Sequence, residues 1–267
     1  MMDSSRPLVR VVAGVVLNEQ GRYLLSSRPE GKPYAGYWEF AGGKVEAGET
    51  ELQALKREFE EELGIQIRQA RPWLTKIHDY EHARVHLRFF RVEAGDWSGE
   101  IQAREGQAWS WQRAGDFDVS PMLPANGPLL AALAVPTELQ GRLKTGLYGE
   151  NGMGGYRVVP FESAERQHGN VLIEETALVK RGKMPEADSV WVVISRPEQW
   201  PHVQDADVVV WRVQNPAAAE AVCSVLEDGV SVPLVVSAAP DAAGKYRNRW
   251  LALGAHTVLV NDETEWA

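Results

Sequence analysis

One stretch of 23 residues, from Gly43 to Ile65, constrains the fold of this chain more than any other: GKVEAGETELQALKREFEEELGI. It predicts a helix over residues 50–63. Thr50 suits the first position because a threonine oxygen accepts hydrogen bonds from the free amides of a first turn, and Gly64, which has no Cβ, suits the C-terminal end. Apolar residues recur at helical spacing and predict one buried stripe, formed by Leu52, Leu55, Phe59 and Leu63.

A second face of this predicted helix carries three glutamates, Glu58, Glu61 and Glu62. They stand at i, i+3 and i+4, so their carboxylates lie together and repel one another. A hard cation between them would remove the repulsion, and magnesium prefers oxygen ligands of this kind. On a bare helix such an acidic run is usually a solvated surface. Here the preceding Gly-Gly turn lets backbone approach a ligand closely, and Arg57 can orient a carboxylate, so the pattern favours a metal site.

The same stretch resembles the Nudix box, Gly-x5-Glu-x7-Arg-Glu-U-x-Glu-Glu-x-Gly-U, in which U is a bulky apolar residue. Every fixed position of that pattern is present in this sequence: Gly43, Glu49, Arg57, Glu58, Phe59, Glu61, Glu62, Gly64 and Ile65. A short motif can match by accident, but a pattern that fixes this many positions, four of them glutamates, rarely does.

The resemblance reaches beyond the box to the MutT-like branch of the Nudix family and spans about residues 8–135. The approach to the box, from Trp38 to Lys44, is similar to that branch, although Ala41 stands in place of its usual proline. The resemblance implies an α/β (α+β) fold, a Nudix α/β/α sandwich with a mixed sheet. The strand-like runs that surround the predicted helix independently favour a mixed sheet with helices.

Individual site residues follow from this resemblance. It implies that a divalent ion, magnesium or alternatively manganese, is held by the Gly42 carbonyl, Glu58, Glu61, Glu62 and Glu105. It implies catalytic roles for Glu58 as the first candidate for the general base, for Glu105 as the second, and for Arg57. It implies substrate contacts from Arg28, Lys44, Arg84 and Asn126, and Phe40 is a candidate apolar wall for the base or alternatively part of the core. Asn126 would read the base, because an amide offers both a donor and an acceptor.

The implied activity is magnesium-dependent hydrolysis of a nucleoside triphosphate, with 8-oxo-dGTP as the expected substrate and 8-oxo-dGMP and pyrophosphate as products. Such an enzyme would cleanse the nucleotide pool. Two alternatives stay open: a Nudix hydrolase of another diphosphate such as ADP-ribose, and a non-catalytic module that binds oxidised guanine. The complete set of glutamates argues against the module, and Asn126, with its spacing from Glu105, favours 8-oxo-dGTP.

Charge and composition narrow the partners. The net charge of −9 disfavours binding of a nucleic-acid polymer, because such binding needs a basic face on the protein. A nucleotide can still bind if cations lie between its phosphates and the acidic side chains of the protein. The sequence contains no run of about 18 apolar residues, so it predicts no membrane span. Met1 to Arg10 does not resemble a signal peptide. Cys223 is the only cysteine, which excludes an internal disulfide. We expect a cytoplasmic monomer or homodimer.

Three histidines lie on and between two predicted strands: His78, His82 and His86. Imidazole is a common zinc ligand, but no cysteine or carboxylate is spaced to complete a ligand set. We therefore expect packed or solvated histidines at these positions.

The chain is predicted to hold two domains. Residues 1–135 would form the Nudix domain, the Gly-rich residues 136–155 a linker, and residues 156–267 a smaller domain. In that last part short apolar strands alternate with helical patterns, which predicts βα units and a parallel sheet. This part faintly resembles a piece of a thiamine-phosphate synthase barrel, although it is short for eight βα units.

Overall fold

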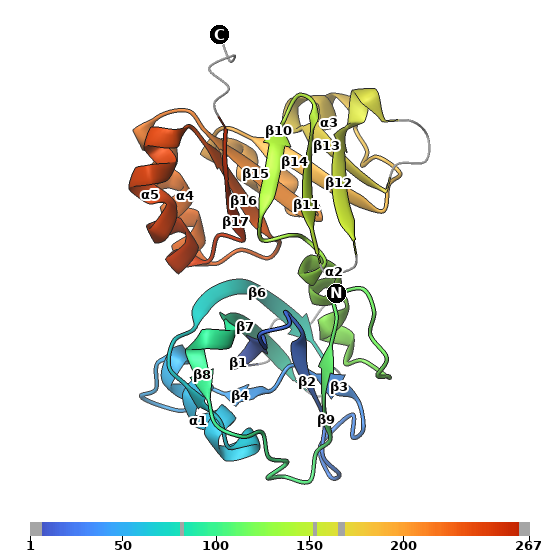
Figure 1. Cartoon of the computed structure of the whole chain (residues 1–267), viewed down its shortest axis with the longest axis vertical. Coiled ribbons are helices and arrows are strands. Elements are labelled where there is room, and N and C mark those ends of the chain that lie inside the picture. The colour runs from blue at the N-terminus through green and yellow to red at the C-terminus, as the bar shows by residue number, and fades with distance from the viewer. Residues whose placement is uncertain (1–6, 81–82, 152–153, 165–168, 262–267) are drawn as a thin grey trace. The chain divides into compact units, whose positions relative to one another are not determined.

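The computed structural model describes residues 7–80, 83–151, 154–164 and 169–261 (Figure 1). It divides into two compact units, Met1–Leu133 and Ala134–Ala267. Among the helices of the described residues, none combines the length and the apolar character that crossing a membrane requires.

The first unit contains a mixed sheet, as the sequence predicts. Its strands lie in the order β4 (Gly42–Lys44), β1 (Leu8–Val16), β7 (Arg84–Val92) and β6 (Arg71–Asp79). β1 is parallel to β7 and antiparallel to β4, while β6 is antiparallel to β7. Two smaller antiparallel sheets complete the unit, formed by β3 (Trp38–Glu39), β2 (Tyr23–Ser27) and β9 (Trp109–Gln112), and by β5 (Gln66–Ile67) and β8 (Trp97–Ser98).

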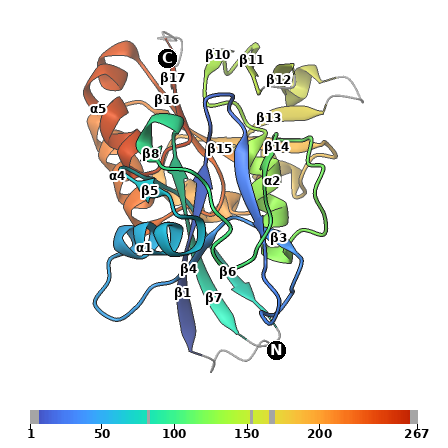
Figure 2. The same ribbon diagram turned by 60° about the horizontal axis from the view of Figure 1, so that its bottom comes forward.

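The helix predicted over residues 50–63 is present as α1 (Glu51–Leu63), and it lies against β1 and β4 (Figures 1 and 2). Thr50 caps its first turn and forms a capping box with Gln53, and Gly64 ends it in the left-handed conformation, with φ 69°. Leu52, expected in the buried stripe, is instead 36 % exposed. Helical spacing sets the direction in which a side chain points, but not where along the helix packing begins.

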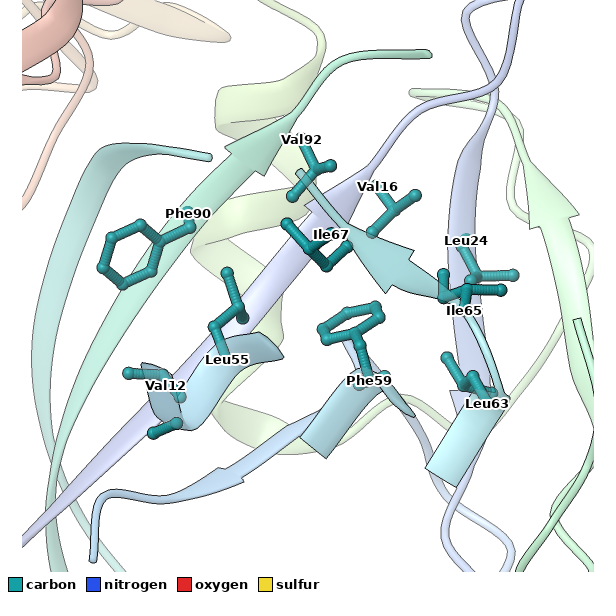
Figure 3. Packing of buried hydrophobic residues seen from close by; sticks show 12 residues of the cluster. Val12, Val16, Leu24, Leu55, Phe59, Leu63, Ile65, Ile67, Phe90 and Val92 are labelled. Atoms are coloured by element: carbon teal, nitrogen blue, oxygen red, sulfur yellow. The ribbon is translucent and has the colours of Figure 1, made fainter. Parts of the chain in front are cut away.

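In the core between α1 and the sheet, every second side chain of the two central strands packs against the apolar stripe of the helix. Figure 3 shows Val12 and Val16 of β1 and Phe90 and Val92 of β7 beside Leu55 and Phe59 of α1. Because side chains alternate along a strand, the intervening residues of β1 and β7 face the other side of the sheet. That other side carries the candidate site described below.

Gly14 lets β1 and α1 approach closely, since a Cβ there would lie 2.6 Å from the ring of Phe59. We expect Gly14→Ala to lower the free energy of unfolding by about 1–3 kcal/mol, the usual cost of overpacking a core. Urea unfolding measures the change, and hydrogen exchange of the β1 and α1 amides localises it to this unit.

Gly127→Ala is the matched control for this prediction. A Cβ at Gly127 would meet nothing within 4 Å, and the residue has helical φ and ψ of −48° and −55°. This substitution should stabilise by about 0.4–1 kcal/mol, because alanine has fewer unfolded conformations to lose than glycine. Equal stability of the two variants would contradict the packing described for Gly14.

The second unit is one eight-stranded sheet whose strands follow one another in chain order. The strands are β10 (Leu139–Arg142), β11 (Gly146–Glu150), β12 (Gly155–Pro160), β13 (Asn170–Glu174), β14 (Ser189–Ile194), β15 (Val208–Val213), β16 (Leu234–Ala238) and β17 (Thr257–Val260). The first three are antiparallel, and β12 to β17 are parallel. β10 also contacts β17, so the sheet curls towards a barrel.

Helices α3 (Glu175–Arg181), α4 (Pro216–Asp228) and α5 (Pro240–Leu253) connect the parallel strands of this unit, which gives the predicted βα pattern. α4 and α5 lie side by side against the outside of the sheet (Figure 1). The inside is filled by large apolar side chains, among them Leu147, Trp191, Val210 and Leu259.

Two expectations for this half of the chain were wrong. The predicted linker 136–155 instead contains β10 and β11, with Gly152 and Met153 outside the described residues. Its glycines allow strands to approach: a Cβ at Gly141 would lie 2.3 Å from a carbonyl of the facing strand, and one at Gly149 would lie 2.5 Å from the Glu138 carbonyl. The glycines of residues 136–155 therefore serve close backbone contact between strands and do not form a flexible linker. The second unit is also not smaller than the first.

Candidate functional site

A cavity of about 620 Å³ lies on the face of the mixed sheet that the core of α1 does not cover. Its apolar floor alternates with the core residues on two strands: Val9, Val11 and Ala13 of β1, and Val85, Leu87 and Phe89 of β7. Phe40 and Leu123 close it further, and Phe40 packs edge to face on Phe89 with ring centroids 6.3 Å apart. The pocket therefore has an apolar part large enough for a flat ring.

Carboxylates of α1 border the same cavity. The side chains of Glu58 and Glu62 are only 15 % and 14 % exposed, whereas that of Glu61 is 61 % exposed. The carboxyl group of Glu58 lies directly against Gly43, where a Cβ would be 2.1 Å from it. A side chain at position 43 would force this carboxylate to move, so glycine keeps Glu58 in its present position.

Arg57 holds this corner of the site together. Its guanidinium donates to both carboxylate oxygens of Glu49 at 2.8 and 2.9 Å, to the Lys44 carbonyl at 3.0 Å and to Glu58 at 2.9 Å. It also reaches Glu61 at 3.2 Å. The hydrogen bond from Arg57, with a second from the Glu46 amide, lowers the pKa of Glu49 to about 2. Arg57 thus acts on the cavity through Glu58, as a positioning residue.

The segment that carries Glu105 reaches the end of α1. Gln107, which is buried, accepts a hydrogen bond from the Glu105 amide and donates one to the Glu62 carbonyl. The ammonium group of Lys32 lies 2.7 Å from Glu105 and 3.5 Å from Glu62. Burial raises the pKa of Glu62 to about 7, with Lys32 opposing the shift and the neighbouring carboxylates adding to it. Sequence reasoning missed Lys32 and Gln107, because neither belongs to a spaced motif.

The donor chemistry of this cluster fits a hard divalent cation. Glu58, Glu62 and Glu105 offer carboxylate oxygens, the Gly42 backbone borders the same cavity, and a positive ammonium group already lies between two of the carboxylates. Magnesium takes oxygen ligands of these kinds. Among the residues that the structure describes, no three His, Cys, Asp or Glu side chains form a ready-made metal-binding group, and Glu61 would have to turn from Arg57 to join one.

The predicted substrate residues are not all in the cavity. Arg28, Phe40, Lys44 and Asn126 line it. Arg28 is held by Glu39, whose two carboxylate oxygens each lie 2.7 Å from the same guanidinium nitrogen. Asn126 is 3 % exposed, and its amide nitrogen Nδ2 has no hydrogen-bond partner among the described residues. A buried donor without a partner in a cavity is a group that a ligand can satisfy.

Arg84 lies elsewhere. Its neighbours Ala83 and Val85 line the cavity, but its own side chain points to the other face of β7 and is 3.5 Å from Asp79. The structure therefore does not bring Arg84 to the cavity with the other predicted substrate residues, because a one-residue step along a strand reverses the face.

The histidines are packed. His78 lies against Tyr80 with ring centroids 4.4 Å apart, and His86 contacts the Thr75 hydroxyl at 2.6 Å. In the register of β6 and β7, His78 pairs with Val85 and His86 with Ile77, which places the two imidazoles on opposite faces. His82 lies outside the described residues.

Known proteins resemble the part of the chain that carries this site. The model of the NUDIX domain matches residues 12–132. The chain is 40 % identical over 128 residues to 8-oxo-dGTP diphosphatase of Haemophilus influenzae, covering 48 % of this chain and 93 % of that protein. It is 38 % identical to CTP pyrophosphohydrolase of Escherichia coli, covering 47 % of this chain and 90 % of that protein. A solved MutT NUDIX hydrolase from Burkholderia pseudomallei is 28 % identical with a TM-score of 0.43, covering 46 % of this chain and 96 % of that one.

The fold and the site define the first unit as an α/β domain with a carboxylate cluster beside an apolar cavity. The chain belongs to the Nudix family, and its first unit is a MutT-like Nudix hydrolase domain.

Proposed function

We propose that the protein is a magnesium-dependent nucleoside triphosphate pyrophosphohydrolase that converts 8-oxo-dGTP into 8-oxo-dGMP and pyrophosphate. One observation carries the proposal: the buried Nδ2 of Asn126, which has no hydrogen-bond partner among the described residues, belongs to a largely apolar cavity that a carboxylate cluster also lines. A ligand that satisfies both parts must join a polar base edge to an anionic group that binds cations. A nucleotide has this composition, and the named substrates of the relatives are nucleotides.

The residues divide the reaction between them. The Gly42 carbonyl, Glu58, Glu62 and Glu105 would hold the divalent ion, with Glu61 joining if it leaves Arg57. When bound, the ion neutralises phosphate charge and makes an attacking water more acidic. Glu58, held by Arg57 and Gly43, accepts the proton from that water. The water oxygen forms a bond to one phosphorus of the α–β linkage, the P–O bond to the bridging oxygen breaks, and 8-oxo-dGMP and pyrophosphate leave as the two products.

Positive side chains beside the cluster bind the phosphate chain. Arg28 and Lys44 both line the cavity, and their charges suit the oxygens where negative charge develops. Arg28 would share its guanidinium between Glu39 and a phosphate oxygen, since a guanidinium carries five N–H donors. Glu39 therefore keeps Arg28 oriented towards the cavity.

Base recognition rests on the carboxamide of Asn126. Its Nδ2 can donate to the O6 oxygen of an oxidised guanine while its Oδ1 accepts from N7–H. Ordinary guanine has an acceptor at N7, which would face the acceptor Oδ1. The rings of Phe40 and Tyr80 line the same cavity and would flank the base.

A second candidate activity is the hydrolysis of CTP. It is favoured by the 38 % identity to CTP pyrophosphohydrolase of Escherichia coli. The two activities place different bases against Asn126, so a nucleotide panel separates them.

The test uses the purified full chain with 8-oxo-dGTP, dGTP, CTP and ADP-ribose, with magnesium, with manganese and with EDTA. We expect pyrophosphate release that needs the metal and is fastest with 8-oxo-dGTP. Preference for CTP or for ADP-ribose would replace the proposed substrate. Binding of 8-oxoguanine nucleotides without hydrolysis of any compound would show a non-catalytic module. A nucleotide-pool enzyme acts where nucleotides are made, so we place it in the cytoplasm, without nucleic-acid or membrane partners.

A further inference from the structure

Among the cavity residues that the structure describes, Lys32 forms its ion pairs with two proposed metal ligands. It belongs to the loop 28–37 between β2 and β3, and its ammonium group lies 2.7 Å from Glu105 and 3.5 Å from Glu62. Each arginine near the site also binds a carboxylate that is not a proposed metal ligand. Arg28 is bound to Glu39, and Arg57 is bound to Glu49 as well as to Glu58 and Glu61.

We propose that Lys32 is an internal cation that holds Glu62 and Glu105 together before metal loading, and that the divalent ion displaces it. This proposal rests on the proposed function of the site. It assigns Lys32 a positioning role that neither the box pattern nor the relatives' names specify.

The charges of the cluster require a cation at this place. Glu62 is mostly buried and lies in the field of three further carboxylates, those of Glu39, Glu58 and Glu105. Like charges in a partly buried site repel strongly unless a positive group separates them. An ammonium group offsets the repulsion between the carboxylates with one positive charge, whereas a divalent ion carries two charges and binds the oxygens directly. The divalent ion therefore displaces the weaker one.

The displaced ammonium group would find a new partner in a bound phosphate chain. Lys32 lines the cavity and its side chain is 43 % exposed, so it is free to turn. Its loop keeps its shape through backbone contacts that do not involve the Lys32 side chain, such as Gly36 N to the Arg28 carbonyl at 2.9 Å. After loading, Lys32 would contact the phosphate chain, so that one lysine pairs with carboxylates in the metal-free site and with substrate in the loaded one.

The test measures metal binding without nucleotide, by titrating Mn2+ and following the signal of the free ion by electron paramagnetic resonance. We expect Lys32→Met to bind Mn2+ about two- to fivefold more tightly than the unchanged protein, because an exposed ion pair shifts an equilibrium by no more than this. Lys32→Arg keeps the charge and should stay near the unchanged affinity. If Lys32 were only a structural brace, its loss would loosen the cluster and weaken Mn2+ binding, which is the opposite sign.

Lys56→Met is the matched control. Lys56 lies on α1 and its ammonium group donates to the Arg68 carbonyl at 3.1 Å, so the variant removes one charge near the cluster without touching Glu62 or Glu105. It should bind Mn2+ as the unchanged protein does. A tightening equal to that of Lys32→Met would reduce the effect to net charge and overturn the proposal.

A second readout follows Lys32 itself, by nuclear magnetic resonance of the 15N-labelled lysine ammonium groups. The Lys32 signal, identified by its absence in Lys32→Arg, should shift with Mg2+ and saturate at the Kd of metal binding. An unchanged Lys32 signal in a protein that binds metal and hydrolyses nucleotide would overturn this proposal and leave the proposed function standing. A protein that neither binds metal nor hydrolyses any nucleotide would overturn both.

Discussion

Replacing Glu58 by glutamine should lower the turnover of 8-oxo-dGTP by about 10²–10⁴-fold, the range that a general base contributes. The amide has nearly the size of the carboxylate, so it still fits against Gly43, where the space is too small for any added atom. It cannot take a proton from water at neutral pH, and it is a weaker ligand for a hard cation. The loss should appear in kcat, since base contacts with Asn126 are unchanged.

The fold should survive this substitution. The glutamine oxygen can still accept from Arg57, which also keeps two hydrogen bonds to Glu49 and one to the Lys44 carbonyl. Glu60→Gln is the matched control, because Glu60 is an exposed residue of the same helix and loses the same charge. We expect normal turnover in Glu60→Gln. Turnover within tenfold of normal in Glu58→Gln would remove Glu58 from the catalytic residues and leave Glu105 as the candidate base.

The local features of the site were predictable because they depend on residues a few positions apart. The cap at Thr50, the end at Gly64 and the packing of Leu55 and Phe59 all follow from helical spacing, and the structure has them. The same spacing brings Glu58 and Glu62 together at the cavity. Interactions of this range are fixed by the geometry of one helix, whatever the rest of the fold does.

Features that depend on strand register or on distant partners could not be predicted in this way. Arg84 was expected at the substrate, but the register of β7 turns it to the other face. Lys32 and Glu105 are 73 residues apart, and Gln107 and Glu62 are 45 apart. No local pattern records such pairs. The strands β10 and β11 were missed for a different reason, since close approach of backbone and flexibility both favour glycine.

Replacing Asn126 by alanine should abolish most of the preference for 8-oxo-dGTP over dGTP. Each lost hydrogen bond to a buried polar group costs about 1–3 kcal/mol, so selectivity, measured as the ratio of kcat/KM values, should fall by about 5- to 150-fold. The activity on dGTP should change little, because Glu58, Glu62 and the phosphate-binding cations remain. Asn126→Leu, which keeps the approximate volume of the side chain, should lose the same preference. Equal selectivity in the unchanged protein and both variants would remove Asn126 from base recognition.

Stability separates this role from a purely structural one. If the Asn126 side chain served to cap the following helix, alanine would lower the free energy of unfolding by about 1 kcal/mol. The buried Nδ2, however, has no partner among the described residues, and an unsatisfied buried donor lowers stability by about 1–3 kcal/mol. Asn126→Leu should therefore unfold at equal or higher urea concentration than the unchanged protein while losing selectivity. A group that destabilises the free protein and discriminates between ligands is explained by ligand binding, whereas a loss of stability together with selectivity would show that Asn126 shapes the pocket only indirectly.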